Sequence, residues 1–194
     1  MIQAIIFDFD GMFYHESTDR FTERFFVDFP QVNQQNVISF FQNELPLCQK
    51  GEKDMKEILQ RELPEWGYPG SVAELLEYWF SDGERDQNIV QLIEKLKKQG
   101  IFCVLCTNNE IYRWTYMKSK YKLETLFDLL VCACDVGMKK PDPQMYTLLE
   151  EQIPFPKKEI LFCDDGLDRV EMAQKLGFQG HQYKNFEMFQ KLFL

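Results

Sequence analysis

The sequence predicts an α/β protein in which a parallel sheet forms the core and a small bundle of helices is inserted after the first strand. Two patterns in the 194 residues lead to this fold class. Short continuous apolar runs, typical of strands buried on both faces, alternate with stretches of helical apolar spacing. Between the first and second runs, helical spacing alone continues through residues 14–85. We therefore expect one sheet core with one helical insertion.

Five apolar runs are expected to form the strands of the core. The first run ends in carboxylates, and the next three are also followed by polar side chains. The runs span residues 3–9, 101–106, 129–134, 160–163 and 178–182. Because helical patterns separate the runs, neighbouring strands are expected to lie parallel.

Stripes of apolar residues at helical spacing predict the core helices. The stripes begin at Ile89, Ile111, Met145 and Val170. Asp142 followed by Pro143 has the residue types of a helix start. Gly100 and Gly177 stand just after apolar stripes, where C-terminal caps belong. The ends of these helices are thus indicated by residue chemistry as well as by period.

The inserted segment, residues 14–85, is expected to be wholly helical. It contains four apolar stripes, which begin at Phe21, Val37, Met55 and Val72. Ser71 and Glu74 have the spacing of a capping box at the start of the last stripe. We interpret residues 14–85 as a small cap over the sheet, and residues 1–13 and 86–194 as the core.

The charge balance argues against nucleic acid as a partner. The chain has 22 Lys and Arg against 31 Asp and Glu, a formal net charge of -9, and such a field does not attract a phosphate backbone. No stretch approaches the roughly 18 apolar residues that span a bilayer, and the opening MIQAIIFDFDG lacks a basic leader. We expect a cytoplasmic protein with no membrane partner.

The six cysteines are expected to be structural thiols. Cys103 and Cys106 lie in the apolar run IFCVLCT, and Cys132 and Cys134 lie in LLVCACD. Cysteine in a buried strand behaves as a small apolar residue. Neither histidine has metal-ligand spacing to these pairs, so the pattern does not indicate a zinc site.

Polar side chains that could react or bind ligands follow the strand-like runs. They are Asp8 and Asp10, then Thr107 and Asn108, then Lys140 in GMKKPDP, and finally Asp164 and Asp165. Ligands of open parallel sheets bind at the carboxyl ends of the strands, so these groups are expected to converge. Several carboxylates with one lysine need a cation, and an oxygen-only site suits Mg²⁺.

These motifs, in this order, resemble those of the haloacid dehalogenase-like hydrolase superfamily. The resemblance rests on FDFDG at residues 7–11, Thr107 at a strand end, Lys140 before Pro141, and FCDDG. It implies a Rossmann-like three-layer core and a helical cap. Within the superfamily the chain is most similar to small sugar-phosphate phosphatases and to the phosphatase domain of soluble epoxide hydrolases.

The resemblance implies roles for the acidic residues. Asp8 is the expected nucleophile, forming an aspartyl phosphate, and Asp10 gives a proton to the leaving oxygen and later takes one from water. Asp8, the backbone carbonyl of Asp10 and Asp165 are the expected Mg²⁺ ligands. Asp164 is expected beside them, supporting the metal through water.

The remaining roles concern the phosphoryl group. Thr107 is expected to donate its hydroxyl to a phosphoryl oxygen, with the backbone amide of Asn108 nearby, and Lys140 to offset charge in the transition state. Gly11 and Phe13 are candidate substrate-binding residues, because they lie where the chain leaves the core for the cap.

Arg169 departs from the family pattern, which commonly has Asn or Asp at this position. Arginine has no acceptor, so another group must orient Lys140. Asp168 is the favoured candidate, with Arg169 turned outward to a surface carboxylate. The alternative is that Arg169 turns inward as an additional phosphate clamp.

The predicted function is Mg²⁺-dependent hydrolysis of a small phosphorylated metabolite such as a sugar phosphate. Two alternatives stay open. One is phosphotransfer to a sugar hydroxyl, as in the mutase branch of the superfamily. The other is a catalytically weak descendant that binds a phosphorylated ligand or a protein partner. The sequence leaves the oligomeric state open.

Overall fold

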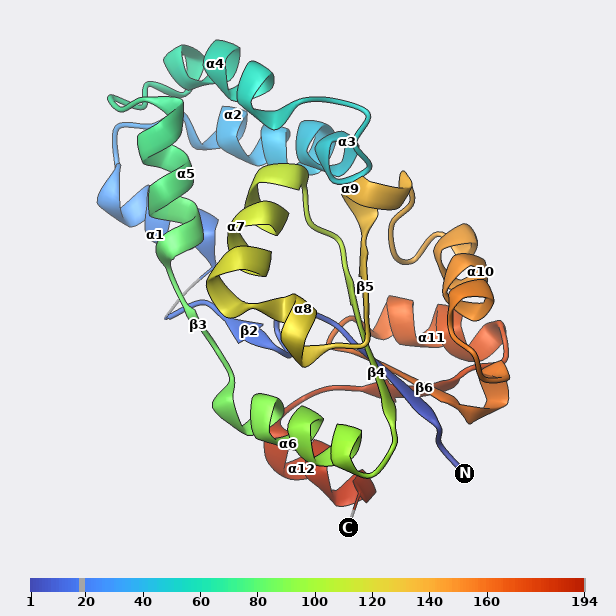
Figure 1. The fold of residues 1–194 in the computed structure, drawn as a ribbon. Helices are drawn as coiled ribbons and strands as arrows, with labels where there is room; N and C mark the ends of the chain where they lie inside the picture. The colour runs from blue at the N-terminus through green and yellow to red at the C-terminus, as the bar shows by residue number, and fades with distance from the viewer. Residues whose placement is uncertain (18–19, 194) are drawn as a thin grey trace.

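The computed structural model describes residues 1–17 and 20–193 and contains a five-stranded sheet at its centre (Figure 1). All strand pairs of this sheet are parallel. In spatial order the strands are β5 (Leu129–Cys132), β4 (Phe102–Thr107), β1 (Ala4–Phe7), β6 (Ile160–Asp164) and β7 (Gln179–Gln182). The α/β fold with a parallel sheet is confirmed, and the first strand lies in its middle.

Helices cover both faces of the sheet and make a three-layer core. Alternate side chains of β1 point to opposite faces, as the period of a strand requires, so Ile5 and Phe7 join one apolar cluster and Ala4 and Ile6 the other. The first face is covered by α6 (Gln87–Lys98), α7 (Ile111–Tyr121), α8 (Leu123–Leu126) and α12 (Phe186–Gln190). The second is covered by α10 (Pro143–Gln152) and α11 (Leu167–Lys175).

Most strand ends agree with the sequence prediction, but β1 ends at Phe7 rather than at residue 9, and β5 also ends two residues early. The run at residues 129–134 stays a strand only to Cys132, because a short helix, α9 (Ala133–Val136), begins directly after it. Gly100 and Gly177 have φ values of 84° and 96° just after α6 and α11, a left-handed conformation that glycine adopts without a Cβ clash.

The inserted helices form a cap with an apolar core of its own, drawn in blue to green at the top of Figure 1. They are α1 (Phe21–Asp28), α2 (Gln34–Ser39), a π-helical turn (Phe40–Glu44), α3 (Leu45–Gln49), α4 (Met55–Trp66) and α5 (Val72–Ser81). Phe25, Leu59 and Trp66 are buried at its centre. The predicted capping box is present, with Ser71 N donating to Glu74 Oε2 at 2.7 Å and Glu74 N donating to Ser71 Oγ at 3.3 Å.

The segment from 14 to 85 is not wholly helical, which corrects the sequence prediction. Its two ends pair as an antiparallel ribbon of β2 (Tyr14–His15) and β3 (Glu84–Arg85). Tyr14 lies opposite Arg85 in this ribbon. Strands of two residues are too short to produce a period in the sequence, so only their tertiary pairing reveals them.

Two features raised by the composition are visible in the fold. Among the residues that the structure describes, no helix has the length and apolar character needed to cross a bilayer. The six cysteines are free, and those at positions 48, 103, 106, 132 and 163 are buried in the packed clusters.

Candidate active site

A cleft of about 680 Å³ opens between the cap and the carboxyl ends of the strands. Its core side includes Asp10, Gly11, Asn108, Asp165 and Arg169. Its cap side includes Phe21, Phe41, Leu45, Gln49 and Trp79. The edge of the sheet at which the sequence predicted the functional side chains therefore forms the core side of the cleft.

Lys140 is the buried centre of the site. Its ammonium donates to Asp8 Oδ1 at 2.7 Å, to Asp164 Oδ2 at 2.6 Å and to the carbonyl oxygen of Cys106 at 2.8 Å. Three acceptors match the three protons of the ammonium, so this buried charge is fully hydrogen-bonded. Burial alone lowers the pKa of Lys140, but the two carboxylates outweigh it and raise the pKa, which keeps the side chain charged.

Asn108 fixes the position of the backbone at Lys140. Its Nδ2 donates to the carbonyl oxygen of Lys140 at 2.7 Å, and its Oδ1 accepts from the amide of Lys140 at 2.9 Å. The side chain of Asn108 thus joins the end of β4 to the lysine-bearing loop. This positioning role was not part of the sequence prediction, which assigned Asn108 to the phosphate.

The carboxylates of Asp8, Asp164 and Asp165 meet the requirements of a hard cation. Their oxygens converge within 4.8 Å of one another. Asp8 Oδ2 is buried and has no hydrogen-bond partner among residues 1–17 and 20–193. Burial, partly offset by Lys140, raises the pKa of Asp8 to about 7, as expected for a carboxylate that lacks sufficient positive charge. The residues present therefore fit Mg²⁺, which prefers oxygen ligands.

Gly11 allows the first loop to approach Asp165. It has a φ of 80°, and a Cβ there would lie 2.5 Å from Asp165 Oδ2. A side chain would be strained by the backbone conformation and would also push Asp165 away. Gly11 is therefore required for the placement of the carboxylates.

Asp10 is held by an arginine that the sequence analysis did not select. Both guanidinium Nη atoms of Arg113 pair with it, at 2.8 Å to Oδ2 and 2.5 Å to Oδ1. Asn109 extends this network, because its Nδ2 donates to Thr107 Oγ1 at 2.7 Å and its Oδ1 accepts from Arg113. The predicted proton carrier and the predicted phosphate-binding hydroxyl are thus parts of one network.

Helix α7 presents Arg113 to the cleft from a capped first turn. Glu110 accepts hydrogen bonds from the amides of Tyr112 at 2.7 Å and of Arg113 at 2.5 Å. The carboxylate after TNN could have indicated this helix start, since acidic residues commonly cap helices. The pairing of Arg113 with Asp10 has no such local signal, because the two residues are 103 positions apart.

Phe13 does not line the cleft, contrary to the sequence prediction. Its side chain is fully buried and packs against Phe9 and Phe127, at ring-centroid distances of 5.5 and 5.6 Å. The turn after Gly11 causes this, because the carbonyl oxygen of Phe9 accepts from the amides of both Phe13 and Tyr14. Phe13 is therefore directed into the core, and Tyr14 faces the cleft.

Asp168 does not orient Lys140, which corrects a second prediction. It is exposed on the first turn of α11, and the acceptors of Lys140 are Asp8, Asp164 and a backbone carbonyl. Arg169 does not turn outward either, because its Nη1 lies 3.0 Å from Asp164 Oδ1. Asp164 thus binds both cations.

Replacing Asp168 with alanine is therefore expected to leave kcat and KM within about twofold of wild type. The change removes only a favourable charge at the start of α11, and we expect a stability loss of less than about 1 kcal/mol. Steady-state kinetics and urea unfolding measure both effects. A tenfold fall in kcat would restore Asp168 as the residue that orients the lysine.

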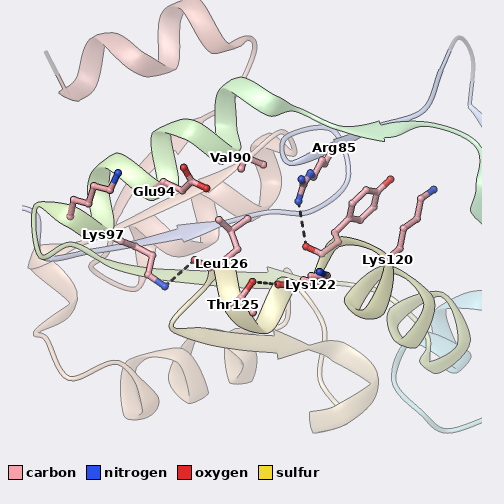
Figure 2. Close-up of a pocket in the computed structure, with 10 residues that line it drawn as sticks. Arg85, Val90, Glu94, Lys97, Lys120, Lys122, Thr125 and Leu126 are labelled. Carbon is pink, nitrogen blue, oxygen red and sulfur yellow. Dashed lines mark hydrogen bonds between the residues drawn. The ribbon is translucent and has the colours of Figure 1, made fainter.

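A second hollow, of about 710 Å³, lies against α6, α7 and α8 (Figure 2). Its cationic lining comprises Arg85, Lys97, Lys98, Lys120 and Lys122. Arg85 donates to the carbonyl oxygen of Tyr121, and Lys97 donates to that of Leu126. The other cleft is lined by Asp10, Asp165 and Arg169, and Arg169 pairs with the buried Asp164, so that cleft is the candidate active site.

The family model for haloacid dehalogenase-like hydrolases matches residues 2–177 of the chain. The chain is also similar to three other proteins. Bifunctional epoxide hydrolase 2 from Sus scrofa is 30% identical over 111 residues, which are 55% of this chain and 20% of that protein. A sesquiterpene phosphatase from Aspergillus oryzae is 30% identical over 115 residues, 59% of each chain. Phosphorylated carbohydrates phosphatase from Thermotoga maritima is 23% identical over 186 residues, 92% of this chain and 83% of that one.

The chain spans about a fifth to a quarter of the length of the epoxide hydrolases that it matches. Among solved structures, a HAD family enzyme from Bacteroides thetaiotaomicron in complex with magnesium and inorganic phosphate is 22% identical. The alignment covers 100% of both chains with a TM-score of 0.83. This likeness shows that the two proteins share one fold, cap included.

Proposed function

The chain belongs to the haloacid dehalogenase-like hydrolase family, and from this we propose that it is a Mg²⁺-dependent phosphatase that hydrolyses a small phosphomonoester through an aspartyl phosphate. One observation carries the proposal. Asp8 is held by Lys140 through Oδ1, while its buried Oδ2 has no hydrogen-bond partner within the described residues and is available for attack once Arg169, 3.6 Å away, moves aside. An anionic nucleophile held this way is suited to covalent catalysis.

In the first step, Asp8 Oδ2 attacks phosphorus in line with the ester oxygen. The P–O ester bond breaks and an aspartyl phosphate forms, while Asp10, which takes up a proton when its ion pair with Arg113 opens, gives that proton to the departing alcohol. As the substrate binds, the carboxyl group of Asp10 must leave its ion pair with Arg113 and turn toward the ester oxygen. When bound, Mg²⁺ supplies positive charge to the phosphoryl group and to the carboxylates around it.

In the second step, water attacks the phosphorus of the aspartyl phosphate. Asp10 takes the proton from this water, and the acyl–phosphate bond breaks. Inorganic phosphate is released, and Asp8 is again a carboxylate. Lys140 and the Thr107 hydroxyl offset negative charge in both transition states, and the cap limits access of bulk water.

Asp10 favours phosphate esters over haloacids as substrates. A halide leaves without a proton, whereas an alkoxide leaving from phosphorus requires one. Asp10 stands two residues after the nucleophile and lines the cleft, where it can serve the leaving oxygen. This residue therefore supports the phosphatase proposal within a family that also contains dehalogenases.

The cap side of the cleft bears on the alcohol part of the substrate. Phe21, Phe41 and Trp79 make an aromatic cluster, with ring-centroid distances between 4.8 and 5.5 Å. Gln49 and Glu16 add polar groups to the same cleft. Sugars commonly bind between polar groups and aromatic faces, and apolar groups bind aromatic faces as well. A substrate panel should therefore include sugar phosphates and phosphate esters of apolar alcohols.

We expect phosphate release from at least one ester of this panel when Mg²⁺ is present, and none after exhaustive chelation. Without a divalent cation, the acidic cleft repels an anionic phosphate. Malachite-green detection of phosphate measures the reaction, with Asp8→Ala as the control for contaminating phosphatases. Full activity in the chelated sample would contradict the proposed metal site. Labelled bisphosphate products from hexose phosphates would instead indicate phosphotransfer.

A further inference from the structure

The geometry points to Arg169 as a tethered cation that competes with Mg²⁺ for the active-site carboxylates, so that metal binding must displace its guanidinium. This inference rests on the metal site of the proposed function and adds a residue that sets its affinity. Arg169 Nη1 lies 3.0 Å from Asp164 Oδ1, 3.5 Å from Asp165 Oδ1 and 3.6 Å from Asp8 Oδ2. These are the three carboxylates whose oxygens converge on a possible cation site.

The two cations of the site take different oxygens of the same carboxylates. Lys140 contacts Asp8 Oδ1 and Asp164 Oδ2, whereas Arg169 faces Asp8 Oδ2 and Asp164 Oδ1. Of the oxygens that the lysine leaves, Asp8 Oδ2 is the proposed nucleophile, and Asp164 Oδ1 stays available to a divalent ion beside Asp165. Arg169 therefore faces carboxylate oxygens that Lys140 does not contact.

The charges of the site show why Arg169 and Mg²⁺ would compete. Three ionised carboxylates and Lys140 have a formal net charge of −2, which one Mg²⁺ neutralises. Arg169 reduces that charge to −1 before any metal arrives. A divalent ion then meets both a weaker attraction and a like charge at close range, in a partly buried site where screening by water is limited.

Of the two cations, Arg169 is the one that is exposed to the cleft. Its side chain is 31% exposed and lines the cleft, whereas the side chain of Lys140 has no exposed surface. Only its contact with Asp164 is short enough for a hydrogen bond, since the distances to Asp8 and Asp165 are longer. The guanidinium can therefore move into the cleft, while the lysine stays in place.

Isothermal titration of the full chain with MgCl₂ tests this inference without any turnover. We expect Arg169→Gln to lower the Kd for Mg²⁺ at least about tenfold relative to wild type. Arg169→Lys keeps the positive charge on a shorter side chain, so its Kd for Mg²⁺ is expected to lie between those of Arg169→Gln and wild type. Lys175→Gln makes the same charge change at an exposed position of the same helix, and its Kd should stay within about twofold of wild type.

Thermal unfolding with and without Mg²⁺ gives a second readout. Metal-free Arg169→Gln should melt below wild type because its carboxylates lose a cation, and Mg²⁺ should raise its melting temperature more than that of wild type. If Arg169→Gln does not fold without metal, the Kd of Arg169→Lys for Mg²⁺ is compared with that of wild type instead. Equal Kd values for wild type and the Arg169 variants would overturn the competition.

Failure of the proposed function gives a different pattern. If neither wild type nor any variant binds Mg²⁺, the metal site itself is contradicted. Mg²⁺ is the appropriate probe because Cys132, Cys134 and Asp135 also bring ligand atoms within 4.8 Å of one another. Thiol ligands select softer metals, so Mg²⁺ binding reports on the carboxylates alone.

Discussion

Asp8→Asn should lose at least about a thousandfold in kcat, because the amide retains the size of the side chain and removes the nucleophilic charge. Lys140 would keep Asp164 and the Cys106 carbonyl as acceptors, so the fold around the site should persist. Phosphate release under saturating substrate measures the loss. Asp168→Asn makes the same chemical change at an exposed position and serves as the matched control.

Trapping by fluoroberyllate gives an independent test of the same nucleophile. This compound mimics a phosphoryl group attached to a carboxylate, so wild type should bind it in the presence of Mg²⁺ and Asp8→Ala should not. Substantial turnover by Asp8→Asn, or equal trapping by both proteins, would place the nucleophile on another residue.

Lys140→Met should remove activity and also destabilise the fold, by about 3–5 kcal/mol. The side chain is buried between Asp8 and Asp164, which are 3% and 0% exposed, and its loss leaves two buried carboxylates with too little compensating charge. Urea unfolding measures the stability. The deficit should shrink as the pH falls, because protonation of these carboxylates removes the repulsion, whereas a simple packing defect would not respond to pH.

Lys139→Met is the matched control for this variant. Lys139 precedes Lys140 in the chain, is half-buried, and donates one hydrogen bond, to Gln49 Oε1 at 3.1 Å. Its replacement should cost no more than about 1 kcal/mol. Equal destabilisation by the two substitutions would show that the buried ion pairs do not account for the effect.

Much of the fold followed from local pattern. The alternation of apolar runs and helical stripes led to the parallel sheet, and the capping box at Ser71 marked the start of α5. The β2–β3 ribbon escaped prediction because its strands have two residues each, and the end of β5 was misplaced because the apolar run continues into α9. Periodicity cannot separate a strand from a helix that directly continues its apolar run.

The sequence by itself determined which chemical groups share the site. Asp8, Thr107 and Asp164 each end or follow a strand, and parallel strands bring their carboxyl ends to one edge of the sheet. Their proximity is thus a consequence of topology, which the order of strands and helices already encodes. No knowledge of side-chain packing was needed to place these three residues together.

Only the tertiary structure decided how these groups pair. Asp164 rather than Asp168 binds Lys140, Arg169 faces the carboxylates, and Arg113 holds Asp10 across 103 positions of chain. Each of these pairings depends on the direction of a side chain, which is set by packing and by competition among several possible charged partners. The sequence shows which charged residues are available as partners. It does not show which of them pair, because pairing depends on distances in the folded protein.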